Sequence, residues 1–177
     1  MRPEDTRYNE WMVLQLRPVR MVDETEFLAA HEAMRADGFP FGLYLDEYPA
    51  WTDYLARLDA LGRGTVEGWV RQDLLLGEVD GAIVGRVSLR YALDEFLAHE
   101  GGHIGYCVLP EQRRRGYATE MLQQSVVRMR SEGVGRILVT CDDDNVASAR
   151  VIERGGGTFE SVVEGRGGIP KRRYWIG

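Results

Sequence analysis

The chain has 177 residues, of which 44% are hydrophobic and 28% charged, values that are ordinary for one soluble globular domain. It carries 28 acidic and 22 basic residues, and the net charge of −6 disfavours a nucleic-acid-binding protein with a broad basic face. No segment approaches the roughly 18–20 consecutive apolar residues of a membrane helix, and residues 1–10 are polar, unlike a secretory signal. We therefore expect a cytoplasmic protein without nucleic-acid or membrane partners, with a polar lead-in over residues 1–10 and a single domain over residues 11–177.

The first predicted elements are a strand and two helices. Apolar side chains in residues 11–19, followed by a proline stop, are typical of a first strand. Asp23 is placed to cap a helix whose apolar spacing ends at Gly38. A second helix is predicted to begin near Pro49, a favourable first-turn residue, and to end at Gly62.

The middle of the chain changes to the period of strands. Residues 69–79 and 82–93 read as two strands joined by Asp-Gly at 80–81, a strong signal for a two-residue hairpin. On the second strand, apolar side chains alternate with arginine and serine. A polar connection over residues 94–102, with room for a short helical turn, leads into a further strand at 103–109.

The last part of the chain contains the clearest helix, residues 116–131. A buried strand at 136–141 and a short helix at 145–154 follow, and two strands at 158–163 and 169–176 close the chain around a glycine-rich loop. The side chains expected on the buried face of the long helix are Tyr117, Met121, Leu122, Ser125, Val126 and Met129.

The element order is β-α-α-β-β-β-α-β-α-β-β. The central strand–helix–strand unit, residues 103–141, should be parallel and right-handed, whereas the flanking hairpins add antiparallel strands. The sequence thus predicts an α/β fold with a mixed central sheet of about seven strands and helices on both faces.

Residues 112–119 connect a strand to the long helix and contain three consecutive arginines. Cations at a helix N-terminus conflict with the helix dipole, but a bound anion would be shared by the arginines, the dipole and the free N–H groups of the first turn. Gly116 lets the backbone approach such an anion, and Ala118 keeps the surface low. The pattern favours a pyrophosphate site; the alternative is a solvated basic loop with an ordinary glycine turn.

These residues resemble a known family. Arg113-x-x-Gly116-x-Ala118 is similar to the Arg/Gln-x-x-Gly-x-Gly/Ala signature of the GNAT acetyltransferases. The strand at 103–110 resembles the fourth strand of that family, and residues 145–159 resemble its second cofactor motif. Two further short runs, residues 101–106 and 172–176, resemble a poorly characterised bacterial subgroup of predicted acetyltransferases.

The resemblance covers about residues 11–177 and implies the acyl-CoA N-acyltransferase fold, with acetyl-CoA as co-substrate and no metal. It implies direct attack of a neutral primary amine on the thioester in a ternary complex; a non-catalytic acyl-CoA-binding module or sensor is the alternative. The cofactor-binding positions that it implies are Tyr106, Cys107 and Val108 beside pantetheine, Arg113, Arg114, Arg115, Gly116, Tyr117, Ala118 and Thr119 around the pyrophosphate, and Asn145 and Ser148 in the second motif.

A general base is expected near the point where the two central strands separate in this family. His103 stands where many relatives have Glu, and a neutral imidazole accepts a proton near pH 7. Glu100, acting through a water, is the alternative base, and His103 would then be structural. Asn145 has two compatible roles, as a plain helix cap and as a hydrogen-bond partner of pantetheine.

The chain departs from the family at one catalytic position. Many relatives have a Tyr seven residues after the motif Asn, as the acid for the thiolate, but this chain has Ile152. Either the thiolate leaves without a protein acid or another tyrosine serves, and Tyr106 and Tyr174 are the candidates.

The acceptor amine is not identified by the sequence. The resemblance implies that the acceptor groove is built by the first two helices and the last hairpin, and residues 39–44 form a lid or a packed loop there. Relatives commonly dimerise, so a homodimer is possible. Cys107 and Cys141 lie in apolar runs and are expected to be buried and reduced.

Overall fold

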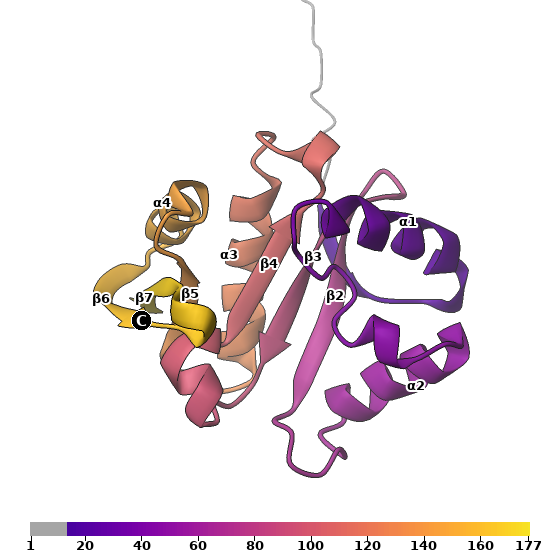
Figure 1. The fold of residues 1–177 in the computed structure, drawn as a ribbon, viewed down its shortest axis with the longest axis horizontal. Coiled ribbons are helices and arrows are strands. Elements are labelled where there is room, and N and C mark those ends of the chain that lie inside the picture. Colours follow the sequence, from indigo (N-terminus) through magenta and orange to yellow (C-terminus); the bar gives the residue numbers. More distant parts are fainter. Residues whose placement is uncertain (1–13) are drawn as a thin grey trace, which may run out of the picture.

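The computed structural model describes residues 14–177 (Figure 1). The lead-in predicted for residues 1–10 and the start of the first predicted strand lie outside the described residues. The described part forms a seven-stranded mixed sheet, as the sequence predicts. In spatial order its strands are β1 (Gln15–Pro18), β2 (Gln72–Val79), β3 (Ala82–Arg90), β4 (Ile104–Val108), β5 (Ile137–Asp142), β7 (Pro170–Ile176) and β6 (Thr158–Glu164).

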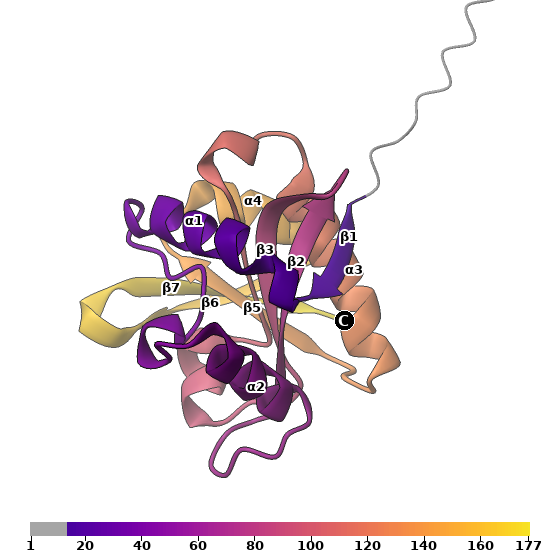
Figure 2. The same cartoon turned by 90° about the vertical axis from the view of Figure 1, so that its right-hand side faces the viewer.

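Helices cover both faces of this sheet (Figures 1 and 2). Side chains of successive residues in β2 belong to two different cores, because neighbouring strand residues point to opposite faces: Leu75 packs in one core, and Leu74 and Leu76 in the other. The first core contains α3 (Tyr117–Ser131) and α4 (Val146–Arg154), and the second contains α1 (Glu24–Arg35) and α2 (Trp51–Gly62).

The long helix and the hairpin form as their sequences predict. All six side chains expected on the buried face of α3 are buried. At the β2–β3 turn, Asp80 and Gly81 both have positive φ, 50° and 80°, which is the backbone that the Asp-Gly pair favours in a tight hairpin. The predicted turn between β3 and β4 is a short π-helix, Leu97–Gly101.

The start of α1 differs from the prediction, because the Asp23 side chain does not cap the helix. Its carboxylate instead accepts two hydrogen bonds from the guanidinium of Arg17, at 2.7 and 2.9 Å, and one from the Arg20 N–H at 2.6 Å. Arg17 and Asp23 are both buried, and a charge-assisted pair between buried groups is stronger than one neutral cap. The helix is therefore entered through a 3-10 turn, Met21–Asp23.

Candidate active site

The central feature of the site is a gap between the parallel strands β4 and β5. Ile104 and Val139 are the one ladder pair that joins these strands in the described chain, next to a hydrogen bond of 2.7 Å from the His103 N–H to the Leu138 carbonyl. Beyond Ile104 the strands separate, which leaves a row of β4 backbone groups facing the gap.

The phase of β4 decides which backbone groups face this gap. Hydrogen bonds from the Arg90 N–H to the His103 carbonyl and from the Leu109 N–H to the Val84 carbonyl join β4 to β3 at odd-numbered residues. Because the hydrogen-bonding direction alternates along a strand, the backbone of Tyr106 and Val108 faces the gap, whereas that of Cys107 faces β3. Cys107 was expected beside pantetheine with its two neighbours, but its backbone already serves the sheet.

The turn between β4 and α3 presents free donors. After the 3-10 turn Pro110–Gln112, the backbone N–H groups of residues 114–118 form no hydrogen bond with any described residue. Arg114 and Gly116 have positive φ, 65° and 87°, so the chain curls and turns successive N–H groups to one side. Five neighbouring donors without acceptors, at the N-terminus of a 15-residue helix, form a cradle for an anion.

The glycine in this cradle is required by its backbone angle. A Cβ atom at Gly116 would meet nothing within 4 Å, so the protein does not crowd the position, but a φ of +87° is strained for any other residue. The open space beside Gly116 is where an anion would approach the N–H groups.

The three arginines of the turn do not act together. The Arg113 side chain donates to the Val108 carbonyl at 3.3 Å and forms an ion pair with Asp37. Arg114 and Arg115 are exposed, and neither forms an ion pair with a residue in the range 14–177. The expectation that three arginines share the anion therefore needs correction, because Arg113 ties the end of β4 to the end of α1.

The second motif closes the other side of the gap. The Asn145 side-chain oxygen accepts from the Ser148 N–H at 3.0 Å, so Asn145 caps α4. The Ser148 hydroxyl is 2.8 Å from the Tyr106 hydroxyl, a hydrogen bond that joins α4 to β4. Burial raises the pKa of Tyr106, so this phenol stays protonated at neutral pH.

The remaining acid candidates lie in the core. Ile152, at the position where relatives often have Tyr, is fully buried. Tyr174 is also buried, stacks edge-on against Phe159 and donates to Glu153 at 3.3 Å. Since β5 lies between β7 and β4, Tyr174 is separated from the gap, and of the two tyrosines Tyr106 is the one next to it.

His103 is buried, and its Nδ1 accepts a hydrogen bond of 2.9 Å from the Leu138 N–H. A neutral imidazole has one basic nitrogen, so this bond occupies the lone pair that a general base needs. Burial and the charge of Arg90 also lower the pKa of His103. The geometry argues for a positioning role, in which His103 joins the starts of β4 and β5.

Glu100 is also engaged. Its carboxylate accepts from the Arg166 N–H at 2.9 Å and pairs with the Arg166 guanidinium at 3.6 Å, in the turn between β6 and β7. The Glu100 carbonyl accepts from the Thr140 hydroxyl at 2.7 Å. These bonds tie the π-helix to β5 and to the last hairpin, so Glu100 is not a free base in this structure.

Sequence reasoning gave no role to the polar side chains of β3. Arg86 is only 2% exposed and donates to the carbonyls of Pro40 and Phe41 at 2.8 and 3.0 Å, which fastens residues 39–44 over the sheet. The signal was present, because Arg86, Ser88 and Arg90 alternate on a strand that is otherwise apolar.

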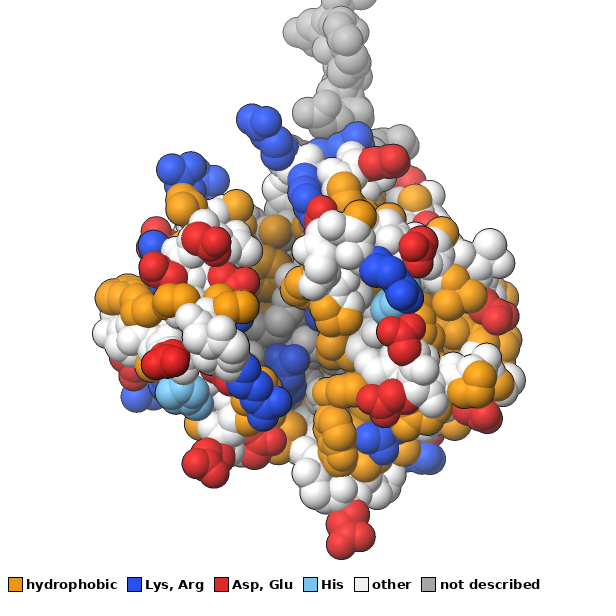
Figure 3. All heavy atoms as spheres, viewed as in Figure 1, with side chains coloured by type: hydrophobic (Ala, Val, Ile, Leu, Met, Phe, Trp, Pro, Cys, Tyr) orange, Lys and Arg blue, Asp and Glu red, His pale blue; other side chains and the backbone are white. Residues whose placement is uncertain are grey.

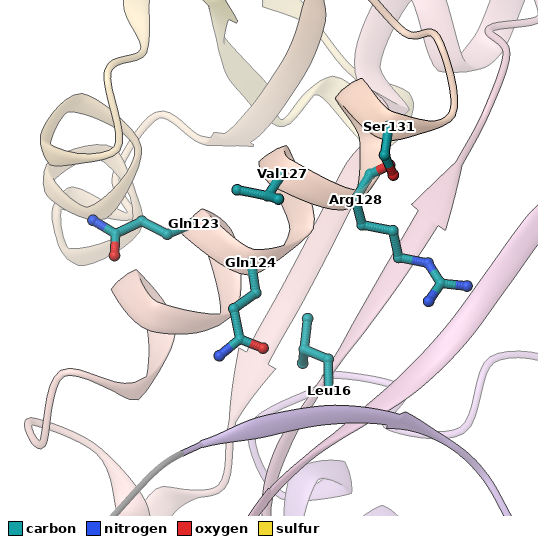
Figure 4. A pocket seen from close by; sticks show the side chains of 6 residues that line it. All are labelled: Leu16, Gln123, Gln124, Val127, Arg128 and Ser131. Carbon is teal, nitrogen blue, oxygen red and sulfur yellow. The ribbon is translucent and has the colours of Figure 1, made fainter. Parts of the chain in front are cut away.

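A deep hollow divides the surface between the α1–α2 half and the half that contains β5–β7 (Figure 3). Arginine or lysine side chains are visible inside it. A separate, open depression lies between β1 and α3, away from the gap (Figure 4). It is lined by Leu16, Gln123, Gln124, Val127, Arg128 and Ser131.

None of the helices in residues 14–177 is long and apolar enough to cross a membrane. No cluster of three or more His, Cys, Asp or Glu side chains in the same range is arranged to hold a metal ion.

Comparison with solved structures identifies similar folds. RimJ of Mycobacterium smegmatis, in complex with CoA-disulfide, is 23% identical with a TM-score of 0.73, and the match covers 93% of this chain and 81% of that one. The microcin C7 self-immunity acetyltransferase MccE, in complex with acetyl-CoA and AMP, is 17% identical with a TM-score of 0.67, covering 92% and 91%. An acetyltransferase of Salmonella typhimurium that modifies the N-terminal serine of ribosomal protein L7/L12 is 19% identical with a TM-score of 0.64, covering 92% and 93%.

No curated protein matches this sequence. The family model described as acetyltransferase (GNAT) domain matches residues 14–158, which include the gap, the anion cradle and the second motif. The seven-stranded fold agrees with that match. The chain therefore belongs to the GNAT acetyltransferase family.

Proposed function

We propose that the chain transfers the acetyl group of acetyl-CoA to a primary amine by direct attack in a ternary complex. The observation that carries this proposal is the run of free N–H groups at residues 114–118, which matches the need of a pyrophosphate for several donors. The complexes of RimJ and MccE with coenzyme A compounds support the same assignment.

The gap would hold the rest of the co-substrate. We assign the pantetheine arm to the β4 edge at Tyr106 and Val108, where free backbone groups can pair with its amides. The N–H groups of these two residues are the nearest donors for the oxyanion that develops when the amine attacks the thioester carbonyl. Asn145, whose side-chain oxygen caps α4, keeps its amide NH₂ available for pantetheine.

The proton inventory favours an acceptor of modest basicity. The basic nitrogen of His103 is occupied by the Leu138 N–H, and the buried Glu100 carboxylate is held by Arg166. Without such a base, the amine must already be neutral to attack. An α-amino group has a pKa of about 7.7–8.0, so about a tenth or more of it is neutral at pH 7, whereas a lysine amine is almost wholly protonated. We therefore propose an α-amino group as the acceptor, as in the Salmonella enzyme that modifies an N-terminal serine.

Tyr106 is the proposed proton donor to the departing thiolate. Its hydroxyl takes the place of the tyrosine that relatives carry on the helix here named α4, and Ser148 holds it there at 2.8 Å.

Dimerisation and a cytoplasmic location stay predictions of the sequence.

A glycine pair provides a direct test of the cradle. Gly116 and Gly133 both have a φ of +87° with nothing within 4 Å of a Cβ atom, so Gly116→Glu and Gly133→Glu introduce the same backbone strain at opposite ends of α3. We expect Gly116→Glu to weaken acetyl-CoA binding at least about tenfold, because a carboxylate would occupy the phosphate position. Gly133→Glu should bind as the wild type does, by calorimetry.

Turnover separates this function from the non-catalytic alternative, which the buried Ile152 favours. A free-thiol assay with acetyl-CoA and a panel of α-amines should release coenzyme A. Binding of acetyl-CoA without release of thiol for any amine would identify an acyl-CoA sensor instead. If Gly116→Glu binds acetyl-CoA as tightly as the wild type does, the cradle does not hold the co-substrate in either an enzyme or a sensor.

A further inference from the structure

A group of polar side chains converges on the sheet face that carries α1 and α2. Arg86, Ser88 and Arg90 alternate on β3, and Gly105 of β4 pairs with Ser88. A Cβ atom at Gly105 would lie 2.9 Å from the Ser88 hydroxyl, 3.6 Å from Arg90 Nη1 and 3.9 Å from Arg86 Nη1. Any side chain at Gly105 would collide with the Ser88 hydroxyl, so a glycine is required where these three polar groups lie beside the β4 backbone.

The positive charge beside Gly105 has no ion-pair partner among residues 14–177. No described carboxylate forms an ion pair with Arg86 or Arg90. Arg86 donates to backbone carbonyls and lies 3.4 Å from the Ser88 hydroxyl, and Arg90 Nη1 is 3.4 Å from the carbonyls of Gly101 and Gly102. Two neighbouring guanidinium groups without a counter-charge are unfavourable in a partly buried site.

Two acidic side chains of the connection between β3 and β4 form their bonds elsewhere. Asp94, whose charge acts on Arg90, accepts from the Leu97 N–H at 2.7 Å. Glu100 is held by Arg166 in the last hairpin. Neither carboxylate forms an ion pair with Arg86 or Arg90.

A fourth donor lies in the same region. Tyr54 is fully buried, and its hydroxyl has no partner in the described part of the chain. Arg86 and Tyr44 are near enough to affect its pKa, which burial raises, so the hydroxyl keeps its proton. A buried hydroxyl without a partner is uncommon, and here it belongs to a region already rich in donors.

We propose that this donor cluster, defined as Tyr54, Arg86, Ser88 and Arg90 around Gly105, binds a carboxylate of the acceptor substrate. Half-buried Arg90 makes the contact, and the buried Ser88, Arg86 and Tyr54 add charge and donors behind it. Gly105 follows Ile104, where β4 and β5 separate, so the carboxylate would lie close to the reacting amine.

This inference rests on the proposed function and narrows its substrate class. The acceptor is a peptide α-amine with a carboxylate close by, as in a peptide whose first residue is Asp or Glu. A free amino acid fits less well, because its own α-carboxylate makes the amine more basic.

The first experiment compares kcat/KM for matched pairs that differ in one charge. Tripeptide amides that begin with Asp or Glu are compared with those that begin with Asn or Gln. We expect the carboxylate member to be preferred about 10- to 100-fold.

Substitutions test whether Arg90 causes the preference for the carboxylate substrate. Arg90→Gln should abolish this preference, and Arg90→Lys should retain part of it, because the positive charge remains. Arg63→Gln removes an exposed arginine that pairs with Asp59 and should leave it unchanged. Equal use of both members by the wild type, or an equal fall for both members in Arg90→Gln, would overturn the proposal.

A binding readout separates this proposal from failure of the acetyltransferase function. The N-acetyl product of the best carboxylate substrate, or an N-acetylated tripeptide amide that begins with Asp or Glu if no amine reacts, is titrated in a thermal melt against its Asn or Gln counterpart. A rise in Tm for the carboxylate in wild type that is lost in Arg90→Gln supports the site even without turnover. No difference between carboxylate and amide in the wild type contradicts it.

Discussion

At the scale of single residues, two tyrosines place their hydroxyl groups in different parts of the fold, one beside the gap and one in the core. The Tyr106 hydroxyl shares a hydrogen bond with the Ser148 hydroxyl across the gap, and the Tyr174 hydroxyl donates to Glu153 in the core. Burial raises the pKa of both phenols, so both stay protonated at neutral pH and differ in position.

Substituting each tyrosine by phenylalanine tests this distinction. We expect Tyr106→Phe to lower kcat about 100-fold with little change in KM for acetyl-CoA, because a positioned general acid contributes about that factor. Tyr174→Phe, the matched control, should leave kcat unchanged and cost about 1 kcal/mol of stability. Steady-state kinetics and denaturant unfolding measure both effects. A similar loss of kcat in the two variants would contradict the assignment of Tyr106.

His103 illustrates how a plausible catalytic residue is identified as structural by one hydrogen bond. Burial and Arg90 hold its pKa below the ordinary value of 6.5, so the folded protein resists a proton that the unfolded chain accepts. As the pH falls through 6.5, the unfolded state binds more protons than the folded state, and the free energy of unfolding decreases.

We expect His103→Asn, which keeps an acceptor for the Leu138 N–H, to fold and to lose part of this pH dependence. His103→Leu leaves that buried N–H unpaired and should cost about 1–3 kcal/mol at neutral pH. Urea unfolding at about pH 5.5 and about pH 7.5 gives both quantities. If His103→Asn abolished turnover while acetyl-CoA still bound, the imidazole would be the base after all.

At the scale of elements, periodic segments could be predicted and backbone-dependent features could not. The buried face of α3 and the Asp80-Gly81 hairpin follow from side-chain spacing and turn chemistry, which are local. The phase of β4, which turns Cys107 toward β3, depends on pairing with a strand that no local pattern of β4 specifies. The N–H cradle was located through its arginines, yet the donors that form it are backbone groups, and Arg113 is paired with Asp37.

Ion pairs between different elements explain the other differences from the sequence. Asp23 has the spacing of a helix cap, but Arg17 claims its carboxylate from β1. Arg113 belongs to the cofactor signature, but Asp37 pairs with it from the end of α1. In each case the competing partner lies far enough along the chain, or in a different element, that propensity alone does not reveal it.

At the scale of the whole molecule, the charge is unevenly distributed. The chain has a net charge of −6, yet Arg114 and Arg115 stand exposed beside the cradle without ion pairs to other described residues. Arg114 and Arg115 would attract the phosphates of acetyl-CoA at short range, whereas the net negative charge of the chain would repel them at longer range. Both forces weaken with salt, but they act over different distances.

The double variant Arg114→Gln/Arg115→Gln should weaken acetyl-CoA binding about three- to tenfold at low ionic strength, with the difference from wild type largely lost near about 0.5 M salt. Arg35→Gln/Arg63→Gln changes the net charge by the same amount on α1 and α2, where both arginines already pair with carboxylates. Titration calorimetry at several salt concentrations compares the two. If local charge controls binding, the affinity for acetyl-CoA falls in the Arg114/Arg115 variant alone, and most at low salt. Equal losses of affinity in the two double variants would mean that net charge controls binding.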